Sequence, residues 1–236
     1  MSEAQTNQSN NAASNQLLNK LRAAVLGAND GVVSTSSVLM GVAGATDNKQ
    51  AIITAGLAAL VAGALSMAVG EYVSVSSQSD AEKAYIAKEK RELKADPAGE
   101  LTELAAAYRA KGISAKTAEK VAKELTEADP LKAHLAVEFG LDEEDVVSPT
   151  HAAVASLVSF SVGGVIPFLT MLWAPEESRI WATIVAVFIT LLATGYGSAR
   201  VGKASHWRAM ARVVVGGLVA MAVTYFVGQW FGAHGL

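Results

Sequence analysis

The stretch AIITAGLAALVAGALSMAVGEYVSVS, residues 51–76, carries only one charged residue, Glu71. A helix needs about 20 residues, at 1.5 Å each, to cross a hydrocarbon core about 30 Å thick. Four other stretches have similar length and apolar character, at about 22–45, 151–173, 180–200 and 209–231. The sequence therefore predicts an all-α integral membrane protein with five transmembrane helices. Short connections predict tight hairpins between helices 1 and 2 and between helices 3 and 4.

The composition supports a membrane protein and excludes several classes of function. The chain has 236 residues, of which 51% are hydrophobic and 17% charged, and its mean hydropathy is +0.31. A net charge of -3 with no basic cluster argues against nucleic-acid binding, and the lack of cysteine excludes disulfides and thiolate metal sites. Neither a phosphate-binding Gly-x-x-x-x-Gly-Lys-Ser/Thr motif nor a Gly-x-Ser-x-Gly elbow occurs, so we expect no enzyme activity and no ATP-driven pump.

Polarity divides the chain into four segments. Residues 1–16 are rich in Asn, Gln and Ser and predict a disordered tail, and residues 17–76 hold helices 1 and 2. Residues 77–150 form a polar insert, in which helices are expected to about 94 and over 98–110, 115–127 and 131–139. Apolar stripes on these helices predict a small bundle. Residues 151–236 hold helices 3 to 5.

The positions of Lys and Arg predict the orientation. With the insert in the cytoplasm, that side carries 17 basic residues against two, Lys49 and Arg179, and six against two when the insert is not counted. We therefore expect a cytoplasmic N-terminus and insert, and a C-terminus outside. The alanine-rich composition favours a bacterial inner (plasma) membrane.

Acidic residues inside the predicted membrane spans indicate transport. Asp30 lies about 12 Å from the cytoplasmic end of its span, where a carboxylate costs about 2.5 to 3.5 kcal/mol unless it faces the bundle interior or a hydrated cavity. Gly27 and Gly31 flank it as a small-xxx-small pair, which predicts that another helix approaches closely there. Glu71 and Met67 lie one turn apart at matching depths, and Ser34 adds an oxygen one turn after Asp30. Such a set suits a borderline divalent ion, and a desolvated carboxylate can take up a proton when the metal leaves. The alternatives are a tolerated, partly hydrated Asp30 and a Met67 that only fills space.

The insert contains a second group of candidate metal ligands. Two Glu-x-x-Glu pairs can each direct two carboxylates toward one point, and a later helix carries a histidine and a glutamate four residues apart. The candidate ligands are Glu89, Glu92, Glu100, Glu103, His134 and Glu138. Oxygen ligands with one imidazole suit Fe²⁺, Mn²⁺ or Zn²⁺. Spacing alone leaves open the alternative of an ordinary solvated helical face.

These motifs together resemble the vacuolar iron transporter family, from about residue 21 to the end of the chain. The resemblance rests on Gly27-Ala28-Asn29-Asp30-Gly31 with Ser34, on Met67 with Gly70-Glu71-Tyr72 and Ser76 to Gln78, and on the twin Glu-x-x-Glu insert. It implies a homodimer that exchanges Fe²⁺, and often Mn²⁺, for protons across the bilayer. It also implies a path lined by Asp30, Met67 and Glu71, and glutamates of the insert that gather metal. Where eukaryotic members place methionines one turn before the last glutamate, this chain has His134 and Leu135.

We therefore expect an exporter of Fe²⁺ or Mn²⁺ that is coupled to protons and contains no resident cofactor. One alternative is a membrane-anchored metal sensor or buffer, against which the intramembrane carboxylates argue. Another is a di-iron oxidase, but such sites usually include Glu-x-x-His pairs, and the insert has none.

Overall fold

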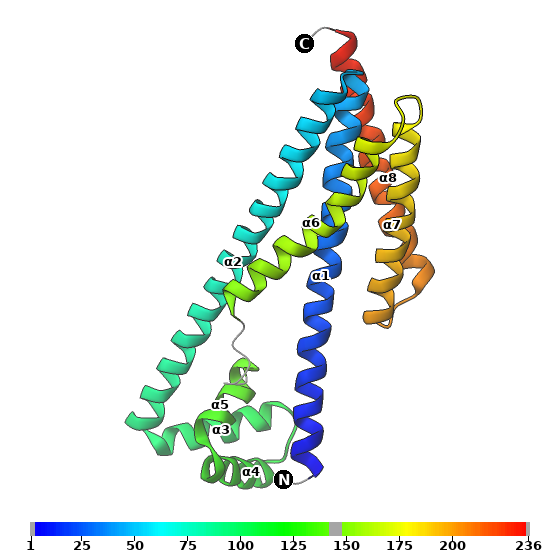
Figure 1. The fold of residues 1–236 in the computed structure, drawn as a ribbon. Coiled ribbons are helices and arrows are strands. Elements are labelled where there is room, and N and C mark those ends of the chain that lie inside the picture. The colour runs from blue at the N-terminus through cyan, green and yellow to red at the C-terminus, as the bar shows by residue number, and fades with distance from the viewer. Residues whose placement is uncertain (1–2, 142–147, 235–236) are drawn as a thin grey trace. The chain divides into compact units, whose positions relative to one another are not determined.

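The structure is a computed structural model that describes residues 3–141 and 148–234. Every regular element in these residues is a helix, and short turns or loops join the helices. The prediction of an all-α protein is confirmed. The elements are α1 (Glu3–Ala45), α2 (Lys49–Ala95), α3 (Pro97–Ala110), α4 (Ala115–Ala128), α5 (Pro130–His134), the π-helical turn η1 (Leu135–Phe139), α6 (Pro149–Trp173), α7 (Arg179–Val201) and α8 (His206–Ala233), shown in Figure 1.

The first helix starts well before the predicted first span. No glycine or proline occurs between Glu3 and Leu26, so the sequence contains no helix-breaking residue in this region. Residues 3–16, which composition predicts to be a disordered tail, lie within the bounds of α1. Residues 1 and 2 of that predicted tail lie outside the described part of the chain.

Among the described residues, four helices are long and apolar enough to cross a membrane: α2, α6, α7 and α8. They contain four of the five predicted spans. The other predicted span lies in α1, where Asn29, Asp30 and a run of hydroxyl residues at 34–37 lower the hydropathy. Of the five predicted spans, the span in α1 is thus the most polar, and it carries the candidate transport residue Asp30.

Contacts divide the chain into two units, which we call the membrane unit (Met1–Glu71 and Ala152–Leu236) and the insert unit (Tyr72–His151). The helix α2 belongs to both and is unbroken from Lys49 to Ala95, as the lack of glycine and proline over 78–93 predicts. Contacts within a chain carry no information about a bilayer. The predicted membrane boundaries at 76/77 and 150/151 therefore stay predictions.

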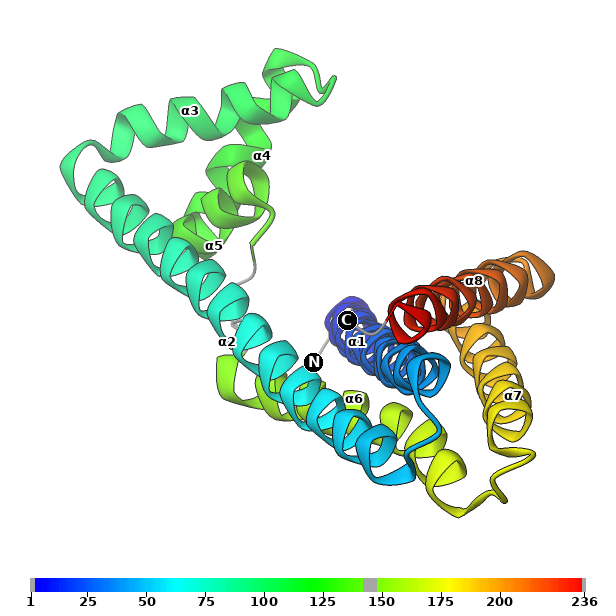
Figure 2. The same cartoon turned by 90° about the horizontal axis from the view of Figure 1, so that it is seen from above.

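The core of the membrane unit lies between α1, α7 and α8, with the start of α2 and the end of α6. Figures 1 and 2 show α8 running beside α1, with α7 packed against both. The buried core side chains are Val32, Leu39, Met40, Ala43, Ile52, Met171, Val187, Leu191, Val214 and Met221. A second apolar cluster, made of Leu60, Ala64 and Phe160, joins α2 to α6.

Glycines allow α1 and α6 to approach at backbone distance. A Cβ atom at Gly31 would collide with the carbonyl oxygen of Phe160, and one at Gly163 would collide with the carbonyl oxygen of Ala28. A Cβ atom at Gly27 would lie 2.8 Å from the Cβ atom of Ser159. The prediction that the Gly27 and Gly31 pair admits a neighbouring helix is therefore confirmed.

The insert unit is built from helices whose ends are set by short polar caps. Asp96 accepts a hydrogen bond from the Gly99 amide at 2.9 Å and begins α3, and Ser114 begins α4 in the same way. Asp129 begins α5, and Gly140, with φ of +65°, ends η1 in the left-handed conformation. The breaks predicted at Asp96-Pro97, Lys111-Gly112 and Asp129-Pro130 are confirmed. The expected last helix, 131–139, changes from α-helical to π-helical at Leu135. The core of the unit comprises Leu104, Ala105, Ala122 and Ala133.

Candidate metal sites

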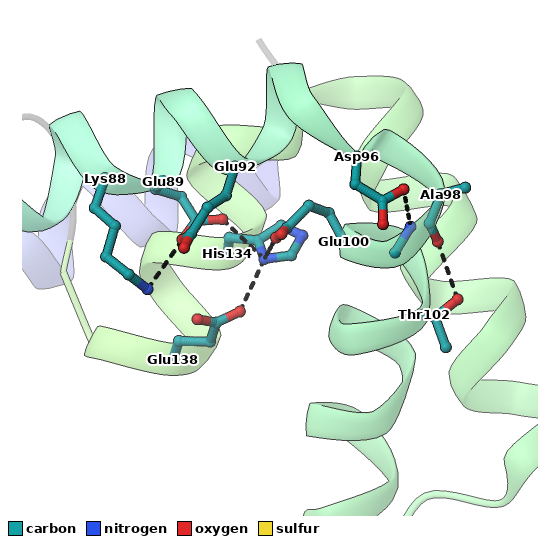
Figure 3. A network of polar contacts seen from close by, with 10 residues as sticks. Lys88, Glu89, Glu92, Asp96, Ala98, Glu100, Thr102, His134 and Glu138 are labelled. Atoms are coloured by element: carbon teal, nitrogen blue, oxygen red, sulfur yellow. Dashed lines mark hydrogen bonds and ion pairs between the residues drawn. The ribbon is translucent and has the colours of Figure 1, made fainter.

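Three predicted metal ligands of the insert come together in one buried cluster. Within residues 3–141 and 148–234, Glu89, Glu100 and His134 each offer a ligand atom, and these atoms lie within 4.8 Å of one another. They come from three elements, α2, α3 and α5 (Figure 3). The side chain of His134 is 0% exposed and that of Glu89 is 2% exposed, whereas that of Glu100 is 13% exposed. The cluster therefore forms only when the insert unit folds.

The Nδ1 atom of His134 lies at the centre of this cluster. Its distances to carboxylate oxygens are 2.8 Å for Glu138, 3.1 Å for Glu89 and 3.6 Å for Glu100. Among the described residues, only the contact with Glu138 has hydrogen-bond geometry, and the buried Oε1 atom of Glu89 has no hydrogen-bond partner. A single imidazole nitrogen carries at most one proton and can satisfy only one of these acceptors well.

Local structure explains how these residues meet. The Asp96-Pro97 turn ends α2 and starts α3, which brings Glu89 and Glu100 to the same cluster. The Asp129 cap starts α5, and His134 is its last residue. Glu138 follows four residues later on η1, so that its carboxylate lies against the imidazole.

The electrostatics of the cluster favour a cation. Burial raises the pKa of the Glu89 carboxyl above its ordinary value of 4.5, and the negative charge of Glu138 raises this pKa further, while His134 opposes the shift. Burial also raises the pKa of Glu100, against the opposing effect of His134. A divalent cation at this position would neutralise charges that burial makes unfavourable.

The second member of each Glu-x-x-Glu pair lies elsewhere. Glu92 forms an ion pair with Lys88 at 2.9 Å, which raises the pKa of the Lys88 ammonium, and its side chain is 41% exposed. Glu103 is exposed on α3. The structure thus brings Glu89, Glu100, Glu138 and His134 together, and it places Glu92 and Glu103 at the periphery. Spacing alone does not distinguish the members of a pair.

The membrane unit contains a cavity of about 540 Å³ that brings two of the candidate path residues together. Its walls come from α1, α2 and α8, and the lining residues are Leu26, Asn29, Asp30, Val33, Met67, Arg212, Val213, Gly216 and Gly217. The carboxylate of Asp30 accepts a hydrogen bond from the Ser34 hydroxyl at 2.8 Å. Glu71, half-buried one turn after Met67, is not among the lining residues. A carboxylate and a thioether from two helices therefore face one open space.

Sequence reasoning did not select two polar residues of this cavity. The Oδ1 atom of Asn29 is buried and has no hydrogen-bond partner in the part of the chain that the structure describes. Arg212 of α8 also lines the cavity, and nothing in the sequence places α8 beside Asp30. The only local signal for Asn29 was its position next to Asp30 within an apolar span.

Comparison with known proteins gives matches over both units. The sequence profile of the VIT family matches residues 21–229. The chain is 42% identical over 209 residues to the vacuolar iron transporter of Acanthamoeba castellanii, a region that covers 88% of this chain and 77% of that protein. It is 39% identical over 217 residues to vacuolar iron transporter homolog 1 of Oryza sativa, covering 92% and 75%. It is 36% identical over 217 residues to homolog 2 of Arabidopsis thaliana, covering 92% and 86%.

Proposed function

This chain belongs to the vacuolar iron transporter family, whose members are integral membrane transporters and not enzymes, and we propose that it exports Fe²⁺, Mn²⁺ or both from the cytosol in exchange for protons. The observation that carries this proposal is the cavity of the membrane unit, because Asp30 and Met67 line it from different helices. A carboxylate and a thioether suit a borderline divalent ion better than Mg²⁺ or Ca²⁺.

The proposed topology has five membrane spans. The helices α2, α6, α7 and α8 supply four, and residues 22–45 of α1 supply the fifth. Asp30 is exposed in the single chain and lines the cavity, which we propose to be hydrated. The distribution of basic residues supports a cytoplasmic N-terminus and insert and an outer C-terminus. The host membrane that we propose is a bacterial inner membrane.

The transport path that we propose includes Asp30, Ser34, Met67 and Glu71. Ser34 donates a hydrogen bond to the Oδ1 atom of Asp30, which orients the carboxylate and leaves Oδ2 to bind an ion. When the ion leaves, a proton on this carboxylate removes a charge that is costly inside the membrane. Metal and proton would then use the same group in turn, which couples their movements. The family resemblance supports a homodimer, with the path at the interface between the protomers.

The insert unit is proposed to collect metal before transport. Glu89, Glu100 and His134 form its buried cluster, Glu138 lies against the imidazole of His134, and Glu92 and Glu103 provide carboxylates at the periphery. The second candidate function, a membrane-anchored sensor or buffer, is supported by this cluster alone. Transport and buffering therefore differ in whether Asp30 is needed for metal to cross the membrane.

Transport into proteoliposomes tests the proposal. The full chain is reconstituted, vesicles with the insert facing outward are selected by protease accessibility, and Fe²⁺ or Mn²⁺ is added outside with the interior acidic. We expect metal uptake driven by the pH gradient, loss of uptake in Asp30→Asn, and normal uptake in the control Asp47→Asn, whose side chain is 99% exposed. Metal uptake that does not depend on the pH gradient would refute proton exchange. Metal binding without any flux would favour the sensor.

A further inference from the structure

His134 differs from the other candidate ligands in its chemistry and in its position. Its imidazole is fully buried, and its Nδ1 atom is the point on which carboxylates from α2, α3 and η1 converge (Figure 3). Its Nε2 atom is buried and has no hydrogen-bond partner within the described chain. No carboxylate of the described residues therefore contacts Nε2, and a cation bound by the glutamates would be bound by Nδ1.

The spacing of these atoms fits one small metal ion. Ligand atoms bound at about 2.0 to 2.2 Å from a first-row ion lie about 2.8 to 3.1 Å apart at the 90° angles of octahedral geometry, and about 3.3 to 3.6 Å apart at tetrahedral angles. The distances from Nδ1 to the three carboxylate oxygens, 2.8, 3.1 and 3.6 Å, fall within these ranges. The ligand atoms of Glu89, Glu100 and His134 also lie within 4.8 Å of one another, so small side-chain movements would bring one nitrogen and two oxygens onto one ion. Glu138, at 2.8 Å from Nδ1, is the candidate for a third oxygen.

We propose that His134 determines the metal selectivity of the insert, because its Nδ1 atom binds the ion directly together with Glu89, Glu100 and Glu138. This inference rests on the proposed function, since it specifies which ions the insert collects. Carboxylates alone accept Mg²⁺, Ca²⁺ and Mn²⁺ readily, whereas imidazole favours the later ions of the first row. The site therefore selects Fe²⁺, Co²⁺ and Zn²⁺ over Mn²⁺, and all of these over Mg²⁺ and Ca²⁺.

Charge supports the same selectivity. Three carboxylates around a neutral imidazole leave a net charge of about -1 after a divalent ion binds, and Lys88, the nearby cation, is engaged by Glu92. Charge alone would thus retain any divalent ion. Discrimination must come from the single nitrogen ligand.

Pulsed EPR of bound Mn²⁺ tests for the nitrogen directly. The full chain is purified in detergent, stripped with chelator and loaded with one equivalent of Mn²⁺. We expect ¹⁴N modulation from an imidazole nitrogen in the wild type, its loss in His134→Gln, and its retention in the control Glu124→Gln, whose exposed carboxylate lies on α4. A variant with His151, His206 and His234 all changed to Gln keeps His134 as the only histidine and must also retain the signal.

Selectivity is measured by competing Co²⁺ against Mn²⁺ on the same proteins. We expect the Co²⁺ to Mn²⁺ affinity ratio to fall about tenfold or more in His134→Gln, while Mn²⁺ binding by the three carboxylates persists. The inference would be overturned if the variant that keeps only His134 showed no ¹⁴N modulation. It would also be overturned if His134→Gln left the Co²⁺ to Mn²⁺ affinity ratio unchanged. If the nitrogen signal is present but proteoliposomes show no transport, the proposed function fails and this inference stands.

Discussion

Replacing Gly31 by alanine tests the close contact that positions Asp30. The new Cβ atom would collide with the Phe160 carbonyl oxygen and lie 2.9 Å from the Gly164 amide nitrogen, where ordinary contacts begin at 3.4 Å. These neighbours are backbone atoms of α6, which cannot rotate away as a side chain can. The helices α1 and α6 must therefore separate, or one of them must bend.

The expected cost follows from two opposing terms. Overpacking of a tight contact costs typically 1 to 3 kcal/mol, and backbone neighbours put this case at about 3 kcal/mol. Alanine regains about 1 kcal/mol over glycine in a helix interior. The net loss of about 2 kcal/mol corresponds to an unfolding temperature lower by about 4 to 8 °C for a chain of this size. Because Asp30 is the preceding residue, we also expect slower metal transport.

The assay is thermal unfolding in detergent, followed by circular dichroism, together with uptake into proteoliposomes. The matched control is Gly197→Ala on α7, where a Cβ atom would meet nothing within 4 Å. This control should unfold at the wild-type temperature or slightly above it. If Gly31→Ala is as stable as Gly197→Ala, the backbone contact between α1 and α6 is not as close as described.

Three further predictions concern charged residues. Arg179→Met should destabilise the chain by about 1.5 to 3 kcal/mol in thermal unfolding, because the buried guanidinium donates to the Asp47 carbonyl oxygen at 3.0 Å; no destabilisation would contradict this role. Glu89→Gln should raise the unfolding temperature of the metal-free chain at pH 7 but weaken Co²⁺ binding at least about tenfold; equal binding would exclude Glu89 as a ligand. The pKa values of Glu89 and Glu100 are raised in the folded insert, so above pH 4.5 the folded insert binds more protons than the unfolded one. The stability of the metal-free chain should therefore fall as the pH rises from 4.5 through the raised pKa values. Melting curves that show the reverse would refute the shift.

Much of the fold follows from local features of the sequence. Proline and glycine set the ends of the insert helices, because they remove a hydrogen-bond donor or favour the left-handed conformation. The Gly27 and Gly31 pair predicted a close helix contact, but the sequence did not identify α6 as the partner. The start of α1 at Glu3 did not follow from composition, which describes a whole segment and does not mark the first residue of a helix.

The sequence by itself determined the types of ligand available: carboxylate, thioether and imidazole groups, with no thiol. It also determined which of them lie in apolar spans, because length and hydropathy are local properties. Only the tertiary structure decided that Glu89 and Glu100 turn inward while Glu92 and Glu103 do not, and that Nδ1 of His134 lies between the carboxylates. The rotation of each helix about its axis depends on its packing partners, and residues three apart in a polar helix carry no signal for it. Selectivity for metal therefore depends on contacts between segments that are distant in the chain.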